Sequence, residues 1–201
     1  MLRLYEFLLS ANCYKARLLM TQLAIPFERI ELDFTKQEHR HPEFLHKNLQ
    51  GKVPVLELET GDFLLESNAI MFYLSKGTQF LPDDHLEQSK VMQWLFFEQY
   101  SLMPYLASCR FWMTILNKAD EFSEIIIEKQ KSGYAALAVM EQHLQSHSFF
   151  VGNQYTIADI GLFAYVHVAD EGGYSLTEFP GIQLWLERVK NQPHYIDITQ
   201  V

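Results

Sequence analysis

The sequence predicts a small mixed α/β domain followed by an all-helical domain, and three observations support this fold class. Residues 1–77 alternate strand-like runs, in which apolar and polar residues take turns, with stretches of helical periodicity. Beyond residue 85 the apolar residues recur at helical spacing. Between these parts, residues 79–85 contain Pro82-Asp83-Asp84 and are typical of a linker. We therefore expect domains at residues 1–78 and 86–201.

The first domain is expected to form a mixed four-stranded sheet with helices on its faces. Strands are expected at 2–7, 27–32, 55–59 and 63–65, and helices from Asn12 or Cys13 to Ala24, at 42–47 and at 67–75. The first strand, helix and second strand predict a parallel pair, because parallel strands need a crossover connection. Thr60-Gly61-Asp62 lies between the last two strands and predicts a hairpin, which is antiparallel.

The second domain is expected to contain helices at 86–117, 121–145, 157–168 and 184–190. Pro104 should kink the first of them, because proline removes a helical hydrogen bond. Thr156 and Asp159 form a capping-box pattern at the start of the third helix. We expect these two residues to serve folding rather than chemistry, with a contribution of about 1–2 kcal/mol.

Composition argues against several classes of protein. Hydrophobic residues make up 48% of the 201 residues, which is enough for a sizeable core. The net charge of −9 argues against non-specific binding to nucleic acid or an anionic membrane, and no apolar run is long enough for a membrane span. Cys13 and Cys109 lack the spacing of a disulfide framework, and His143 and His147 lack a third metal ligand. We expect a cytoplasmic protein without a metal.

The stretch Gly51–Leu56 (GKVPVL), followed by Leu65–Ile70 (LESNAI), is the most informative part of the sequence. Proline cannot donate to a sheet ladder, so Pro54 marks a strand start or edge. If the Val53–Pro54 bond is cis, the Val53 N–H and C=O turn outward, where an extended peptide can pair with them. Ser67 stands at a helix N-terminus, which attracts a carboxylate. Together these features suggest a site for a small peptide with free carboxylates; the alternative is an ordinary strand and an ordinary helix cap.

Three motifs in this order resemble those of the soluble glutathione transferases, in their bacterial, theta-like branch. They are Leu9–Arg17 (LSANCYKAR), the two stretches just described, and Thr156–Asp159 (TIAD). The resemblance covers essentially the whole chain. It implies a thioredoxin-like first domain that binds glutathione as co-substrate, without a prosthetic group. It also implies a symmetric homodimer, with contacts expected through residues 67–75 and near Met92 and Phe96.

The resemblance assigns glutathione contacts to named positions. In the family, a cis-proline follows a valine whose backbone pairs with the cysteinyl part of the tripeptide, which matches Val53 and Pro54. A Glu-Ser pair holds the γ-glutamyl carboxylate and amine, which matches Glu66 and Ser67. A lysine before the valine, here Lys52, often reaches the glycyl carboxylate.

The residues before Lys52 match the family pattern less closely. In theta-like members a histidine that matches His39 helps the lysine contact; the alternative is a solvated loop histidine. Asn48–Gly51 (NLQG) departs from the family's usual Asn-Pro-x-Gly, so the turn loses its proline and keeps its glycine.

Activation of the glutathione thiol has three candidate residues. Ser10 precedes the first helix, where a hydroxyl donor and the helix N-terminus can both favour a thiolate. Asn12 is the second candidate, because its amide can donate to sulfur. Cys13 falls one residue after the position of the cysteine in beta-like members and is expected to pack into the helix start. Tyr5 lies too early in the strand to match the tyrosine of the animal classes.

The resemblance implies an enzyme that conjugates glutathione to hydrophobic electrophiles, as in detoxification, in a pocket between the domains. Tyr105, Phe111 and Trp112 are the candidate residues for the electrophile, with core packing as the alternative. A glutathione-dependent disulfide reductase or peroxidase is a second interpretation, in which Asn12 would matter more. A non-catalytic binding or scaffold protein is the third, against which the intact set of motif residues argues.

Overall fold

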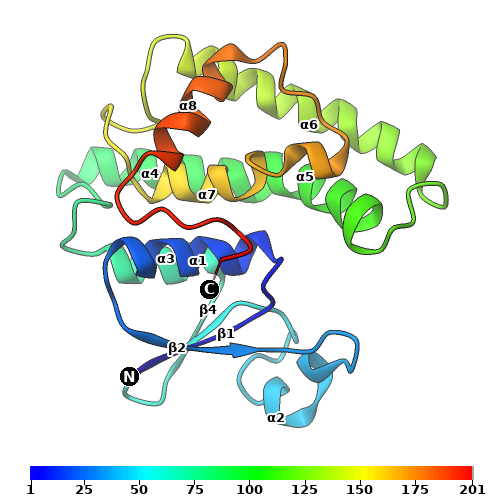
Figure 1. The fold of residues 1–201 in the computed structure, drawn as a ribbon. Coiled ribbons are helices and arrows are strands. Elements are labelled where there is room, and N and C mark those ends of the chain that lie inside the picture. The colour runs from blue at the N-terminus through cyan, green and yellow to red at the C-terminus, as the bar shows by residue number, and fades with distance from the viewer. Residues whose placement is uncertain (201) are drawn as a thin grey trace. The chain divides into compact units, whose positions relative to one another are not determined.

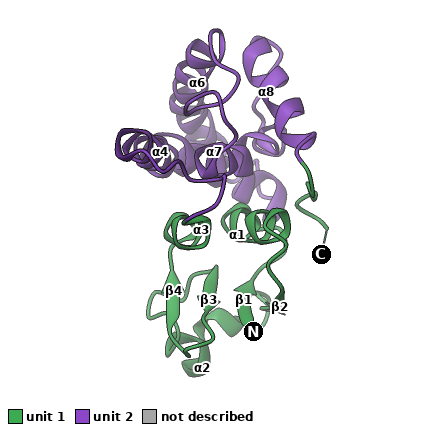
Figure 2. Cartoon of the chain, turned by 90° about the vertical axis from the view of Figure 1, so that its left-hand side faces the viewer, with its two compact units in different colours: residues 1–76, 193–201 green, residues 77–192 purple. Residues whose placement is uncertain are grey.

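The computed structural model describes residues 1–200 and contains two compact units. The first is Met1–Lys76 together with the C-terminal segment from Pro193, and the second is Gly77–Gln192 (Figure 2). Figure 1 shows the sheet in the first unit and the long helices in the second. The predicted fold class is therefore confirmed.

The sheet contains β1 (Leu2–Glu6), β2 (Phe27–Glu31), β3 (Val55–Glu57) and β4 (Phe63–Leu65) in the order β2-β1-β3-β4. β1 pairs with β2 in parallel, and the β1–β3 and β3–β4 pairs are antiparallel. The crossover and the hairpin were both predicted from the sequence.

Helices cover both faces of this sheet. Leu4 and Leu56 point to the face covered by α1 (Ala11–Gln22) and α3 (Ser67–Ser75), where they pack with Ala16, Met20 and Ile70. Tyr5 and Val55 point to the other face and pack with Leu32 and Phe44 of the short helix α2 (Pro42–Leu45) and its surroundings (Figure 1). The alternation of side chains along β1 and β3 therefore places the starts of α1 and α3 on one side of the sheet.

A buried ion cluster fixes the connection from β1 to α1. The Glu6 carboxylate, fully buried, accepts hydrogen bonds from Arg17 and Arg29. Arg17 also donates to the Leu8 carbonyl at 3.1 Å and to the Ile198 carbonyl at 2.6 Å. This guanidinium therefore ties together the strand end, the loop before Ser10 and the C-terminal segment, which the sequence had assigned to the helical domain.

The second unit begins with a helical region that the sequence predicted as one helix. The structure divides it into α4 (His85–Phe97), a π-helical turn (Glu98–Leu102), α5 (Met103–Arg110) and a second π-helical turn (Phe111–Ile115). Pro104 is the second residue of α5. A proline lacks its N–H and its ring clashes with the preceding turn, so the wider π-helical turn before it relieves both problems.

The rest of the second unit contains α6 (Ser123–Leu144), α7 (Ile157–Val166), a 3₁₀ turn (Ala169–Gly172) and α8 (Pro180–Lys190). The predicted capping box at Thr156 is present, with its N–H donating to Asp159 Oδ2 at 2.9 Å. None of the helices in the described part of the chain is long and apolar enough to cross a membrane.

Helix α8 begins four residues earlier than predicted. The first N–H groups of α8 are capped from α6, because Glu141 accepts from Gly181 N and Ile182 N, each at 3.0 Å. This cap comes from a residue 40 positions away in sequence, so no local pattern predicts it.

Candidate functional site

Ser10 is the N-cap of α1. Its backbone is extended, and its Oγ accepts from the Cys13 N–H at 3.3 Å. The side chain is half-buried. A hydroxyl that accepts one bond still has its own proton to donate. Ser10 therefore offers a donor at a helix N-terminus, the position expected from the sequence; its role towards a thiol stays a prediction.

Asn12 lies in the first turn of α1 and is linked to α3. Its Oδ1 accepts from Ser67 Oγ at 3.0 Å. Its NH2 group has no hydrogen-bond partner among residues 1–200 and is not buried. The structure therefore joins two residues that the sequence placed in different roles, one at the thiol and one at the carboxylate.

Lys15 is a residue of this region that the sequence analysis missed. It is fully buried, and its Nζ lies 3.1 Å from Asn68 Oδ1 and 3.4 Å from Ser67 Oγ. Helical periodicity alone treats a lysine as solvent-exposed. Every residue from Cys13 to Met20 is buried, so α1 has no exposed face along this stretch.

The start of α3 presents free donors and an exposed carboxylate. The Ser67 N–H has no hydrogen-bond partner within the described residues, as is usual for the first N–H groups of a helix. Glu66 precedes it with φ of 66°, an unusual backbone conformation for a residue with a side chain. Its side chain is exposed and does not cap α3. An amine and a carboxylate on one ligand could be held here together.

The segment before β3 offers an unpaired backbone. The Val53–Pro54 peptide bond is cis. Val53 is half-buried, and in the part of the chain that the structure describes neither its N–H nor its C=O has a hydrogen-bond partner. An extended peptide could pair with both groups, as an added strand would. The Lys52 side chain is exposed beside them.

The turn Asn48–Gly51 is held without the family's proline. Asn48 is buried; its Nδ2 donates to the Lys52 carbonyl at 2.8 Å and its Oδ1 accepts from the Gln50 N–H at 3.0 Å. Gly51 has φ of 61°, and a Cβ there would lie 2.7 Å from the His39 carbonyl oxygen. The glycine is therefore required both by backbone conformation and by the close approach of the preceding turn.

His39 lies in the 3₁₀ turn Glu38–Arg40 rather than in an irregular loop. Its ring stacks on Phe34, with centroids 4.2 Å apart, and its buried Nδ1 has no partner among the described residues. Burial, followed by the charges of Arg40 and His41, lowers the pKa of His39 below its ordinary value. At neutral pH it is a neutral hydrogen-bonding group rather than a fixed cation.

Neither the candidate Cys13 nor Tyr5, which the sequence analysis already excluded, is suited to activate the glutathione thiol. Cys13 is completely buried, and burial raises the pKa of its thiol to about 12. A thiol with this pKa is almost entirely protonated at neutral pH and is a poor nucleophile. The Tyr5 hydroxyl donates to Glu57 Oε2 at 2.6 Å, and burial with this bond raises the pKa of Tyr5 to about 12.

The aromatic candidates in the second unit divide into two groups. Lys129 Nζ lies 5.6 Å from the ring centre of Tyr105 and 5.9 Å from that of Trp112, so these two rings share one cation. Trp112 also stacks on Phe122, with centroids 5.0 Å apart. Phe111 is 48% exposed, and no ring or cation contact within residues 1–200 joins it to the other two.

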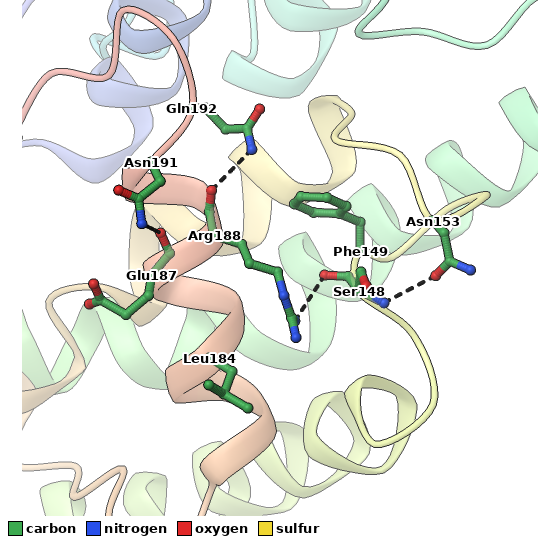
Figure 3. Close-up of a pocket in the computed structure, with 8 residues that line it drawn as sticks. All are labelled: Ser148, Phe149, Asn153, Leu184, Glu187, Arg188, Asn191 and Gln192. Atoms are coloured by element: carbon green, nitrogen blue, oxygen red, sulfur yellow. Dashed lines mark hydrogen bonds between the residues drawn. The ribbon is translucent and has the colours of Figure 1, made fainter.

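A separate hollow on the second unit contains none of the predicted site residues. It has a volume of about 600 Å³, opens broadly to solvent, and lies between the loop after α6 and the end of α8 (Figure 3). Its polar groups are bonded to one another: Arg188 donates to the Ser148 carbonyl, and the Ser148 N–H donates to Asn153. We assign no role to it. In the described part of the chain no cluster of side chains could hold a metal ion.

The first unit has free backbone groups before β3 and two helix N-termini, an arrangement suited to a small peptide with free carboxylates. The chain matches the family model of the glutathione S-transferase N-terminal domain over residues 1–76 and that of the C-terminal domain over residues 99–193. The protein belongs to the glutathione S-transferase family.

Solved structures agree. A glutathione S-transferase from Pseudomonas fluorescens is 44% identical, with a TM-score of 0.97 and coverage of 99% of both chains. A possible glutathione S-transferase from Rhodopseudomonas palustris is 40% identical, with a TM-score of 0.97 and coverage of 100% of this chain and 98% of that one. A glutathione transferase from Burkholderia graminis, solved with two glutathione molecules per subunit, is 26% identical, with a TM-score of 0.84 and coverage of 96% and 85%.

Curated relatives are more distant. A glutathione S-transferase-like protein of a Fusarium species is 27% identical and covers 99% of this chain and 97% of its own. The disulfide-bond oxidoreductase YfcG of Escherichia coli is also 27% identical, with coverage of 92% and 88%.

Proposed function

We propose that the protein binds glutathione in its first unit and activates the thiol for transfer to a hydrophobic electrophile. The main support for the proposal is that the first unit has a hydrogen-bond donor without a partner for the cysteinyl backbone, for the γ-glutamyl carboxylate and for the thiol of the tripeptide. These groups are the Val53 backbone, the Ser67 N–H and the Asn12 amide, which all belong to the same unit. Membership of the family supports this ligand.

Each part of the tripeptide has a proposed partner. The γ-glutamyl carboxylate takes the Ser67 N–H, where the helix N-terminus favours negative charge. Its amine takes the exposed Glu66 carboxylate. The cysteinyl backbone pairs with Val53, beside Pro54.

The glycyl carboxylate is proposed to reach Lys52, whose ammonium is exposed at the edge of the same turn. His39, neutral because its pKa is lowered, can add a hydrogen bond but not a lasting charge. Lys52 therefore supplies the electrostatic part of this contact.

Ser10 and Asn12 are proposed to stabilise the glutathione thiolate. A free thiol has a pKa of about 8.5, so only a few per cent is ionised at pH 7. Hydrogen-bond donors and the N-terminus of α1 favour the anion, and a lowering of about 1.5 units makes half of it reactive at pH 7. The thiolate sulfur then forms a bond to the electrophilic carbon, and the leaving group departs with its electron pair. Binding in a fixed orientation adds a proximity effect.

Tyr105 and Trp112 are proposed to contact the electrophile, because both rings are apolar and lie within 6 Å of the same ammonium group, that of Lys129. Phe111, which is more exposed, is proposed to contact larger substrates. Detoxification is the corresponding biological role.

A second candidate function is glutathione-dependent disulfide reduction. The free Asn12 amide and the likeness to an oxidoreductase named for disulfide bonds support it. Since Cys13 is buried, the exchange would involve glutathione itself: its thiolate attacks a substrate disulfide and releases a thiolate. A second glutathione thiolate then releases the reduced substrate and forms glutathione disulfide.

Isothermal calorimetry with glutathione tests the binding proposal. We expect one site per chain, weakened about 10- to 100-fold in Ser67→Ala, because the buried Lys15 ammonium and the Asn12 carboxamide both lose a hydrogen-bond partner at the start of α3. Glu66→Ala should weaken binding as well. Ser89→Ala, an exposed serine of α4 in the second unit, is the matched control and should bind as the wild type does. Absence of binding by the intact protein would refute both enzyme functions.

Turnover with a panel of aromatic electrophiles and of small disulfides separates the two candidates. Conjugation of electrophiles without disulfide reduction supports the transferase. The reverse result supports the reductase and contradicts the transferase proposal.

A further inference from the structure

Lys15 connects the two helices that begin at the proposed ligand. It lies in the first half of α1, and its Nζ contacts Asn68 Oδ1 at 3.1 Å and Ser67 Oγ at 3.4 Å, both in the first turn of α3. The residue is completely buried, which is rare for lysine and costly unless its polar head is bonded. A side chain kept in this position calls for an explanation beyond packing.

The direction of each hydrogen bond in this cluster follows from the donors available. An ammonium group has only protons to give, so Ser67 Oγ accepts from Lys15. Ser67 has one proton of its own, and the acceptor within reach among the described residues is Asn12, at 3.0 Å. Asn12 must therefore turn its oxygen, not its nitrogen, towards Ser67.

This orientation leaves the Asn12 NH2 group on the other side of the carboxamide. Within residues 1–200 it has no partner, and it is not a buried atom. If the Asn12 carboxamide were flipped, its oxygen would take the place of the NH2 group. The Ser67 hydroxyl proton would then have no acceptor. An oxygen at that place would repel a thiolate, whereas an NH2 group donates to it.

We propose that Lys15 is a positioning residue for thiol activation: through Ser67 it holds the Asn12 carboxamide so that its NH2 group donates to the glutathione sulfur. The inference rests on the proposed function, because it requires glutathione at this site. It adds a third member to the pair Ser10 and Asn12, one that acts without touching the ligand sulfur.

A double-mutant cycle tests this inference. The variants are Lys15→Met, which keeps the length and removes the donors, Asn12→Ala, and the two combined. The readout is the apparent pKa of bound glutathione, followed by the ultraviolet absorbance of the thiolate. We expect Lys15→Met to raise this pKa by about one unit, a tenfold change, in the wild-type background and by much less in Asn12→Ala. Lys15→Arg, which restores a cationic donor, should recover part of the shift.

One control and one substitute variant complete the experiment. Lys131→Met removes an exposed lysine of α6 and should leave the pKa unchanged. If Lys15→Met does not fold, Ser67→Ala replaces it in the same cycle, because it breaks the link at the next residue and must show the same dependence on Asn12.

An equal shift in both backgrounds would overturn the inference, because Lys15 would then act by charge at a distance and not through Asn12. So would no shift in either background. Both outcomes leave the proposed function intact if the wild type binds glutathione with a lowered thiol pKa. If the wild type does not bind glutathione, it is the proposed function that fails.

Discussion

Ser10 has two tasks at the start of α1, since the same oxygen that caps the helix is proposed to donate its proton to sulfur. The two tasks are compatible, because capping uses a lone pair and donation uses the hydroxyl proton. A substitution at this residue should therefore affect both helix stability and thiol chemistry, and the two effects can be measured separately.

We predict that Ser10→Ala raises the apparent pKa of bound glutathione towards that of the free thiol and slows conjugation near neutral pH, while glutathione affinity changes little. The loss of one charge-assisted donor corresponds to about 1.5–3 kcal/mol. Thiolate absorbance against pH measures the first effect. Thermal unfolding should show a separate loss of about 1 kcal/mol from the missing cap. If the titration is unchanged in Ser10→Ala and shifted in Asn12→Ala, Asn12 alone carries the role and disulfide reduction gains support.

Asp159 links the stability of the second unit to pH. The carboxyl is fully buried, accepts from Thr156 N, Phe150 N and Trp185 Nε1, and burial raises its pKa from 3.8 to about 6. Between about pH 4 and pH 6 the folded protein keeps a proton that the unfolded chain has released. The stability associated with this raised pKa is fully present below about pH 4 and is lost as the pH rises through 6.

Chemical unfolding of the wild type and Asp159→Asn across this range tests the prediction. Between pH 4 and pH 6.5 the free energy of unfolding of the wild type should fall by up to about 3 kcal/mol relative to that of the variant. This follows because one pKa unit corresponds to about 1.4 kcal/mol. A constant difference between the two proteins across this window would show that Asp159 does not titrate there.

The positions of individual candidate residues could be predicted from the sequence where they belong to a short motif. Ser10, Val53-Pro54 and Glu66-Ser67 lie in local patterns with a known backbone geometry, and the structure places them at helix starts and at the strand edge, as expected. Lys15 was missed because its partners are 52 and 53 positions away in sequence. Only the packing of α1 against α3 brings them together.

At the scale of elements, the caps show where local patterns suffice and where they fail. The capping box of α7 is complete within Thr156 and Asp159 and was predicted from four consecutive residues. The cap of α8 is supplied by Glu141 of α6, and the helix begins at Pro180 instead of Leu184. The position of the C-terminal segment likewise depends on residues distant in sequence. Tyr14 and Arg17 of α1 donate hydrogen bonds to its carbonyl groups, and no local sequence pattern predicts these contacts.

Glu141→Ala should therefore destabilise the second unit. Its removal leaves the Gly181 and Ile182 N–H groups buried without acceptors, at a cost of about 1–3 kcal/mol in the free energy of unfolding. Glu128→Ala, an exposed glutamate of the same helix, is the control and should change stability by no more than about 0.5 kcal/mol. Equal effects of the two substitutions in denaturant titrations would contradict the capping role.

At the scale of the whole molecule, the order of strands and helices was predictable because it depends on periodicity and turn residues along the chain. The π-helical turns before and after α5 and the place of the C-terminal segment depend on tertiary contacts, so they could not be predicted from the sequence. The aromatic candidates for the electrophile illustrate the same limit. Tyr105 and Trp112 share Lys129, and Phe111 does not, although all three lie within eight residues of one another.

We predict that the protein is a homodimer, with contacts through α3 and through α4 near Met92 and Phe96. Exposed aromatic residues at these places support it: Tyr73 is 54% exposed and Phe96 66% exposed. Phe96→Glu should weaken the dimer, because a charge would be buried without a partner. Leu184→Glu, on α8 and similarly exposed, is the control and should leave the mass unchanged. Light scattering of the wild type at micromolar concentration would contradict the prediction if it gave a monomer mass.

The central claim is that the first unit holds glutathione as a reactive thiolate. The most direct measurement is the ultraviolet absorbance of the thiolate in the complex of glutathione with the intact protein, recorded against pH. We predict an apparent thiol pKa about 1–2 units below the free value of about 8.5, so that half or more of the bound ligand is ionised close to neutral pH. Binding with a thiol that titrates at its free value would contradict the claim.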